Sequence, residues 1–362
     1  IILRNDVINE ATKMKSAQCY IGRTPLKNPV ICGSGEHVMT EAGLRLALKT
    51  GVGGVVAKSV NETMAARDQL DRTDYALLDG QWNRLPWDFS APHHATLACR
   101  SGLQKMDFDS WLDIIARLDD HAANSGQYVI GSIILADLEA SLVMARRMEA
   151  AGVRILEFNI GTPYGDEASG VVTTERVTSR VTEIVKAVCD TVDIPVWAKI
   201  TGQSENVAAL AQAAREGGAD AVVLMGRFLG MIPELDTQAP LLETNLGTGG
   251  GWALPITCYW LAKTRKTLGA EVPLVGMNGA RSGHDVLRML LAGAHAVEIS
   301  SAVFTNGFGV LSEAIETVEK YLSDRSQAPA DITGRAADQL RPFADLPQRP
   351  GYWEQFVPPG AV

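Results

Sequence analysis

Residues 273–301 read PLVGMNGARSGHDVLRMLLAGAHAVEISS and decide how the rest of the chain is interpreted. The short apolar runs at 273–277 and 296–300 are typical of strands that are covered on both faces, as in a parallel sheet. Between them, residues 282–292 carry apolar side chains at helical spacing. The turn AGAH follows, in which a glycine can adopt the left-handed conformation that ends a helix. The stretch therefore predicts a strand, a helix and a parallel strand in succession.

The same unit recurs along the whole chain, with helical segments between most of the apolar runs. The expected strands lie at 28–33, 53–58, 128–134, 155–160, 195–200, 221–225, 273–277 and 296–300. Eight such units that close on themselves form the simplest architecture, so we predict an α/β fold, a single (β/α)8 TIM barrel over residues 1–362. An open, doubly wound sheet is the alternative, but the G-x-G-x-x-G that marks it does not follow the first strand.

Two connections, at 60–108 and 226–255, are too long for simple loops between a strand and a helix. Both follow the carboxyl end of a strand, which is the face where barrel enzymes have their active sites. We therefore predict two lid insertions, with surface decoration or a subunit contact as the alternative. The last segment, 328–362, is rich in proline and is expected to form an irregular C-terminal arm.

Composition excludes several classes of function. The chain of 362 residues has a net charge of −9 and no dense basic run, which argues against nucleic-acid binding. It also has no apolar stretch long enough for a membrane-spanning helix. The five cysteines are scattered without C-x-x-C spacing, so no metal site is expected, and this pattern fits a cytoplasmic protein.

Glycines and serines at the ends of the last strands suggest a phosphate site. Their backbone N–H groups can approach an anion closely, and barrels often bind phosphate after the seventh and eighth strands. Tight turns without a ligand are the alternative. The candidate residues are Gly249, Gly250, Asn278, Gly279, Ser300 and Ser301.

Two lysines, Lys58 and Lys199, end apolar strands, and a buried lysine requires an anionic partner. That partner is either a bound anion or electron-rich ring, or a barrel carboxylate such as Glu157 or Glu298. Asn159 interrupts another apolar strand and also calls for a hydrogen-bond partner.

At these residues the sequence resembles a known family. The segments NPVICGSG, GGVVAKSVNE, ILEFNIGTPYG, IPVWAKIT and GMNGARSGHDVLRMLLAGAHAVEISSAV occur in the order found in the dihydroorotate dehydrogenase superfamily. The closer resemblance is to the FMN-binding barrel of dihydropyrimidine dehydrogenases. It implies bound FMN and hydride transfer at flavin N5. It also implies that Gly33, Ser34, Lys58, Asn159 and Lys199 line the flavin, while the glycine and serine set above binds its phosphate.

The sequence departs from the family pattern where the substrate is expected. Thr162 stands at the position of the family's catalytic Cys or Ser, and Tyr164 replaces an asparagine. In the pyrimidine branch a later Cys serves as the acid, and here Thr174 stands in that region. After the sixth strand the chain reads LMGRF, with Arg227 where the family offers Asn-Ser or Asn-Thr. The lid asparagine corresponds to Asn83.

Other residues are candidates for the missing roles. Glu36 and His37 follow the first strand and are expected as a base or substrate contact, and Arg227 can bind a carboxylate through two parallel hydrogen bonds. We therefore predict an FMN-dependent oxidoreductase that acts on a CH–CH bond of a small cyclic or unsaturated carbonyl compound other than a pyrimidine. The alternatives are a dihydroorotate or dihydropyrimidine dehydrogenase proper, and a colourless, non-redox lyase or isomerase in which Lys199 forms a Schiff base. An unidentified electron acceptor or donor and a homodimer are also expected.

Overall fold

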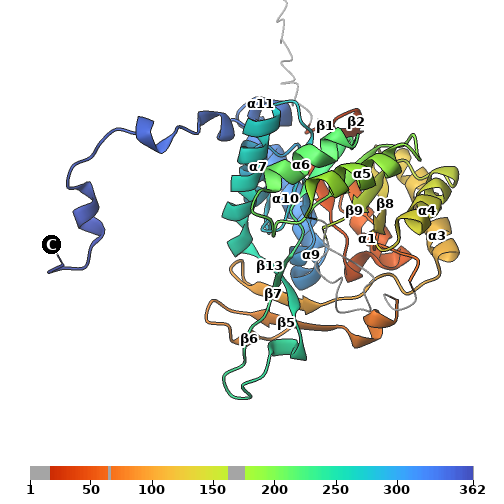
Figure 1. Ribbon diagram of the computed structural model, residues 1–362, viewed down its shortest axis with the longest axis horizontal. Coiled ribbons are helices and arrows are strands. Elements are labelled where there is room, and N and C mark those ends of the chain that lie inside the picture. Colours follow the sequence, from red (N-terminus) through yellow and green to blue (C-terminus); the bar gives the residue numbers. More distant parts are fainter. Residues whose placement is uncertain (1–16, 64–66, 162–175, 362) are drawn as a thin grey trace, which may run out of the picture.

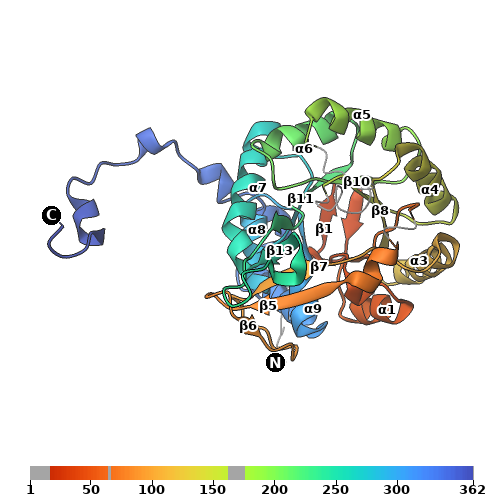
Figure 2. The same cartoon turned by 60° about the horizontal axis from the view of Figure 1, so that its bottom comes forward.

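The computed structural model describes residues 17–63, 67–161 and 176–361 and shows a closed barrel of parallel strands ringed by helices (Figures 1 and 2). The order around the barrel is β10-β11-β14-β15-β3-β4-β8-β9. These strands are β3 (Val30–Cys32), β4 (Gly54–Val56), β8 (Tyr128–Ile134), β9 (Leu156–Asn159), β10 (Val196–Lys199), β11 (Ala221–Leu224), β14 (Leu274–Met277) and β15 (Ala296–Ile299). All eight coincide with predicted strands, so the predicted (β/α)8 TIM barrel is confirmed.

The helices pack outside the strands, and several begin at a capping side chain. Ser282 caps α8 by accepting a hydrogen bond from the backbone N–H of Asp285, and Asp137 caps α4 through Ala140. The helices are α1 (Glu41–Lys49), α3 (Phe108–Ala123), α4 (Leu138–Ala150), α5 (Thr178–Cys189), α6 (Val207–Glu216), α7 (Leu254–Leu268), α8 (Gly283–Leu291), α9 (Ser301–Asn306), α10 (Gly309–Ser323) and α11 (Pro329–Ile332).

The apolar core has two layers, because each barrel strand faces both the helices and the barrel interior. One layer lies between strands and helices, and the other fills the barrel. A hairpin of β1 (Cys19–Ile21) and β2 (Thr24–Leu26) adds Ile21 and Leu26 to the interior layer, next to Trp197. The interior is therefore packed at the hairpin end, which leaves the opposite end of the barrel for a site.

The two long connections pair with each other to form one antiparallel sheet in the order β12-β13-β7-β5-β6 (Figure 1). The first connection supplies β5 (Asp74–Leu78), β6 (Arg84–Leu85) and β7 (Thr96–Arg100), and the second supplies β12 (Phe228–Gly230) and β13 (Leu246–Gly250). We call this the insertion sheet. Its function as a lid stays a prediction.

The C-terminal segment begins on the barrel and then leaves it. Arg265 of α7 makes two hydrogen bonds to Asp338, and the backbone of Gly334 bonds to that of Leu290. Residues 340–361 are exposed except for Val357, and they extend away from the barrel in both views (Figures 1 and 2). The irregular arm that the sequence suggested is therefore anchored only at its root.

Across the described parts of the chain, every helix is too short or too polar to cross a bilayer. The same residues contain no group of His, Cys, Asp and Glu side chains suited to hold a metal ion.

Candidate active site

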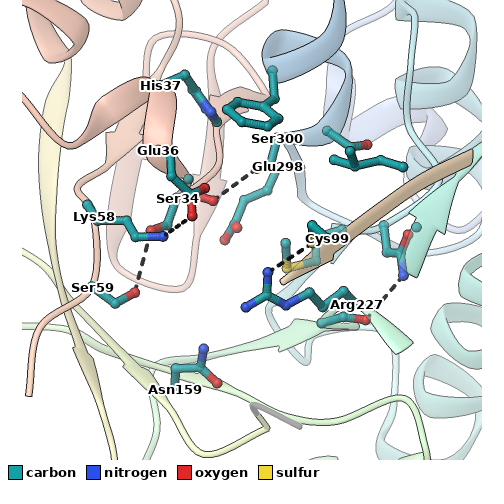
Figure 3. A pocket seen from close by; sticks show the side chains of 18 of the residues that line it. Ser34, Glu36, His37, Lys58, Ser59, Cys99, Asn159, Arg227, Glu298 and Ser300 are labelled. Carbon is teal, nitrogen blue, oxygen red and sulfur yellow. Dashed lines mark hydrogen bonds and ion pairs between the residues drawn. The ribbon is translucent and has the colours of Figure 1, made fainter. Parts of the chain in front are cut away.

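A cavity opens at the carboxyl ends of the barrel strands, between the barrel and the insertion sheet. It encloses about 1100 Å³ of space, part of it open to solvent. Figure 3 shows Lys58 and Glu36 on one side of this cavity and Arg227 beside Cys99 on the other. The residues that line it include Ser34, Glu36, His37, Lys58, Tyr75, Cys99, Asn159, Lys199, Arg227, Thr248, Gly249, Asn278, Gly279, Glu298, Ser300, Ser301 and Phe304.

One end of the cavity has the character of a phosphate cradle. Asn278 has a φ of 66° and Gly279 a φ of 106°, so the chain turns sharply after β14. A Cβ on Gly249 would lie only 2.9 Å from Asn278 Oδ1, and one on Gly279 would lie 2.4 Å from the Leu254 backbone nitrogen. Ser300 and Ser301 add hydroxyl groups at the start of α9. These features fit the phosphate group of FMN.

Replacing Gly279 by Ala is expected to lower both FMN retention and stability. The new side chain would be strained at positive φ and would also clash with the Leu254 backbone. Gly307→Ala is the matched control, because Gly307 has a φ of 81° but no atom within 4 Å of its added Cβ. We expect the backbone strain at positive φ to lower the free energy of unfolding of both variants by about 1–2 kcal/mol. Only Gly279→Ala should lose flavin as well. Equal FMN content in the two purified variants would contradict the cradle.

A buried group of three ionisable side chains lies at the centre of the cavity floor, with Lys199 and Glu298 lining the cavity. Lys199 Nζ donates a hydrogen bond to Glu157 Oε1 and another to Glu298 Oε2, each at 3.0 Å. Burial alone would lower the pKa of Lys199, but the two carboxylates outweigh it and raise the pKa. Burial and the nearby Glu157 raise the pKa of Glu298 to about 8. Lys199 therefore lines the cavity and is also ion-paired, so the two interpretations of this lysine are compatible.

A second ion pair lies beside the first. Lys58 Nζ is 3.2 Å from Glu36 Oε1, and both side chains are largely buried. Burial lowers the pKa of Lys58, and Glu36 offsets part of this effect. Burial would raise the pKa of Glu36, yet Lys58, Arg227 and the Tyr75 hydroxyl outweigh it and keep the pKa below its ordinary value. Glu36 therefore presents an ionised carboxylate at neutral pH.

Arg227 follows β11 and reaches across the cavity to the insertion sheet. Its Nη1 donates hydrogen bonds to Ser101 Oγ at 2.6 Å and to Cys99 Sγ at 3.4 Å. These contacts fix the guanidinium among the lining residues (Figure 3). A planar guanidinium held in this way is well suited to bind a carboxylate.

His37 is less suited to the role of base that the sequence suggested. Its ring lies between Phe304 and Phe308, with Nε2 3.1 Å from the Gly33 carbonyl oxygen. Burial lowers the pKa of His37 to about 4, so the ring is neutral over the physiological range. The contacts favour a packing role for this side chain.

The structure brings most of the predicted residues together. Gly33 and Gly250 adjoin the cavity without lining it, and Asn83 does not lie there at all. Asn83 is exposed at the β5–β6 turn and is hydrogen-bonded to Asp79, so its role as a substrate contact stays a prediction. The predicted residues that line the cavity are Ser34, Glu36, His37, Lys58, Asn159, Lys199, Arg227, Gly249, Asn278, Gly279, Ser300 and Ser301. Thr162, Tyr164 and Thr174 lie outside the described residues.

Several lining residues were not predicted from the sequence. Tyr75 and Cys99 come from β5 and β7, and Thr248 comes from β13. Short apolar runs such as YALL at 75–78 and TLAC at 96–99, which are typical of strands, were the available signal. It could not show which strands pair across the two insertions.

Comparisons with known proteins agree with this geometry. The sequence profile described as dihydroorotate dehydrogenase matches residues 75–322. The chain belongs to the dihydroorotate dehydrogenase family. It is 27% identical over 313 residues to "Dihydroorotate dehydrogenase B (NAD(+)), catalytic subunit" of Methanocaldococcus jannaschii, covering 86% of this chain and 94% of that protein. It is 30% identical over 318 residues to the protein of the same name from Pyrococcus horikoshii, with the same coverage of 86% and 94%.

A shorter match extends the comparison to another branch. "Dihydroorotate dehydrogenase A (fumarate)" of Lacticaseibacillus paracasei is 35% identical over 179 residues, or 48% of this chain and 59% of that protein. The predicted FMN and oxidation or reduction at a CH–CH bond are confirmed by membership of this dehydrogenase family. The closer resemblance to dihydropyrimidine dehydrogenases is not confirmed. The non-pyrimidine substrate has no support among the relatives, whose names favour the alternative prediction.

Proposed function

We propose that this dehydrogenase transfers a hydride from the CH–CH bond of dihydroorotate, a small cyclic carboxylate, to FMN held in the cavity. The observation that carries the proposal is the pair of cationic side chains, Lys58 and Arg227, which line the same cavity from opposite sides. Two such groups suit a carboxylate. The family's established chemistry supplies the reaction type.

The residues present fit FMN. The glycine and serine cradle would hold its phosphate, and Lys199 and Asn159 would face its ring. Bound FMN supplies the two-electron acceptor. The chain itself orients the substrate, with Arg227 held by Ser101 and Lys58 held by Glu36. Burial of these groups strengthens their electrostatic interactions with a bound anion.

The proton that leaves the substrate carbon requires an acceptor. We propose Glu36 for this role, because its carboxylate lines the cavity and is ionised at neutral pH, so it has a free lone pair to accept the proton. Thr162 and Thr174 remain proposals from the sequence alone. The electron acceptor and the homodimer also remain predictions.

The first experiment is the visible spectrum of the purified protein, followed by denaturation and identification of the released cofactor. We expect a flavin spectrum and released FMN. Dihydroorotate should then bleach the flavin under anaerobic conditions. NAD⁺, fumarate and oxygen are added separately as acceptors, since the relatives' names include the first two.

Two outcomes separate the parts of this proposal. A protein that binds FMN but is not reduced by dihydroorotate would contradict the substrate while leaving the flavoprotein intact. Screening other small cyclic or unsaturated carboxylates would then test the non-pyrimidine prediction. A colourless protein that does not take up added FMN would overturn the redox function itself.

A further inference from the structure

The group formed by Lys199, Glu157 and Glu298, which we call the buried triad, has an unusual charge balance. It comes from β10, β9 and β15, and one ammonium donates to a carboxylate on each side at 3.0 Å. The exposed fractions of the side chains are 7% for the lysine and 0% for both glutamates. Two carboxylates and one ammonium carry a net negative charge unless a proton is added, and burial makes such a charge costly.

Among the residues that the structure describes, the neighbouring elements do not supply a second cation to the triad. From β8, Ser132 Oγ lies 3.5 Å from Glu157 Oε1, and the buried Cys32 of β3 is close enough to Glu298 to be affected by its charge. Burial and Glu298 together raise the pKa of Cys32, so this thiol stays neutral. Lys58, after β4, is engaged with Glu36 at 3.2 Å.

The two carboxylates also retain oxygens that a shared proton would satisfy. Glu157 Oε2 and Glu298 Oε1 are buried without a hydrogen-bond partner among the described residues. A buried acceptor without a donor is destabilising, whereas a protonated carboxyl can donate to its neighbour. The geometry thus favours one proton on the pair, as in other sites where two carboxylates lie close together.

We propose that Glu157 and Glu298 share one proton next to Lys199, and that this pair binds a proton more tightly when the cofactor in the cavity is reduced. The inference rests on flavin binding in this cavity and not on the identity of the substrate. Hydride transfer brings two electrons and one hydrogen nucleus into the cavity and adds one negative charge. The deprotonated pair then takes up one proton from solvent, and no electron moves onto the carboxylates.

The direction of the pH effect follows from the burial of the pair. Burial, followed by the charge of Glu157, raises the pKa of Glu298 to about 8. Near neutral pH the pair therefore already holds its proton and the triad is neutral. Above that pKa the triad is negative, so proton uptake on reduction is expected in the alkaline range.

The test measures the midpoint potential of the FMN-loaded protein from neutral to alkaline pH, in wild type and Glu298→Gln. The variant keeps one ammonium and one carboxylate and has no shared proton. Uptake of one proton makes reduction tenfold less favourable per pH unit, which is about 30 mV for a two-electron couple. We expect wild type and Glu298→Gln to have equal midpoint potentials near neutral pH. In the alkaline range the midpoint potential of wild type should fall more steeply with pH than that of the variant, by up to about 30 mV per pH unit. Glu216→Gln, an exposed substitution on α6, is the matched control and should follow wild type.

A second measurement does not depend on flavin. Infrared spectra of the protein with and without FMN should show the carbonyl stretch of a protonated carboxylic acid near neutral pH. This band should disappear in Glu298→Gln and persist in Glu216→Gln. If Glu298→Gln does not fold, Glu157→Gln serves instead, because it also leaves one carboxylate. Parallel potentials in wild type and variant, or an acid band that neither substitution removes, would overturn the proposal.

Discussion

Replacing Arg227 by Gln is expected to raise the KM for the proposed substrate, dihydroorotate, by about 30- to 1000-fold, which corresponds to about 2–4 kcal/mol. The side chain lines the cavity and is positioned by Ser101 and Cys99, so its planar group can bind a carboxylate in a fixed orientation. The loss should lie mainly in KM, because the interaction exists before and during hydride transfer. Steady-state kinetics on the FMN-loaded protein measure the effect.

Two controls separate charge recognition from structural damage. Arg227→Lys keeps the charge but loses the planar fork, so an intermediate KM is expected. The neutral amide of dihydroorotate lacks the carboxylate, so Arg227→Gln and wild type should have similar KM values for it. An equal rise in KM for the acid and the amide, or a loss of bound FMN, would show that Arg227 maintains the shape of the cavity and does not bind the substrate carboxylate.

The barrel was predictable from the sequence because each unit carries its own local signals. Apolar runs such as 273–277 are short and buried on both faces, and glycines such as Gly293, with a φ of 120°, end the helices. The convergence of glycines and serines on one side of the cavity was predictable for a related reason. Parallel strands all end at the same edge, so the glycines and serines that follow neighbouring strands must meet there.

The insertion sheet was not predictable, and this explains the residues that were missed. Its strands β5, β7 and β13 pair across two insertions that are far apart in the sequence. Neither the partners nor the register can be derived from one strand alone. The antiparallel pairing brings Tyr75 and Cys99 into the cavity and leaves Asn83 at an exposed turn.

Lys199 shows a different limit of sequence analysis. Its position at the end of an apolar strand indicated that it needed an anionic partner. The sequence presented a ligand and a barrel carboxylate as alternatives. In the fold, β9 is paired with β10, and β15 belongs to another part of the same barrel. Each of these two strands directs a carboxylate at the Lys199 ammonium, and Lys199 also lines the cavity. Only the closed barrel shows that both partners are possible together.

Replacing Lys199 by Met is expected to lower the free energy of unfolding by about 3–5 kcal/mol near neutral pH. The substitution retains volume but removes the only cation that contacts Glu157 and Glu298 among the described residues. Both carboxyls would then favour protonation, because burial opposes their charged forms. A group whose pKa is raised on folding stabilises the protein below its unfolded pKa and loses that contribution as pH rises through its folded pKa. The deficit should therefore be small in acid and should grow as the pH rises above the ordinary glutamate pKa.

Chemical unfolding of wild type and Lys199→Met at several pH values measures this difference directly. The matched control is the triple variant Lys199→Met, Glu157→Gln, Glu298→Gln, which contains no ionisable group at these positions. It should recover much of the stability and lose most of the pH dependence, since no uncompensated buried charge remains. A deficit that is the same at every pH, and that the triple variant does not relieve, would indicate that Lys199 stabilises the barrel through packing and not through its charge.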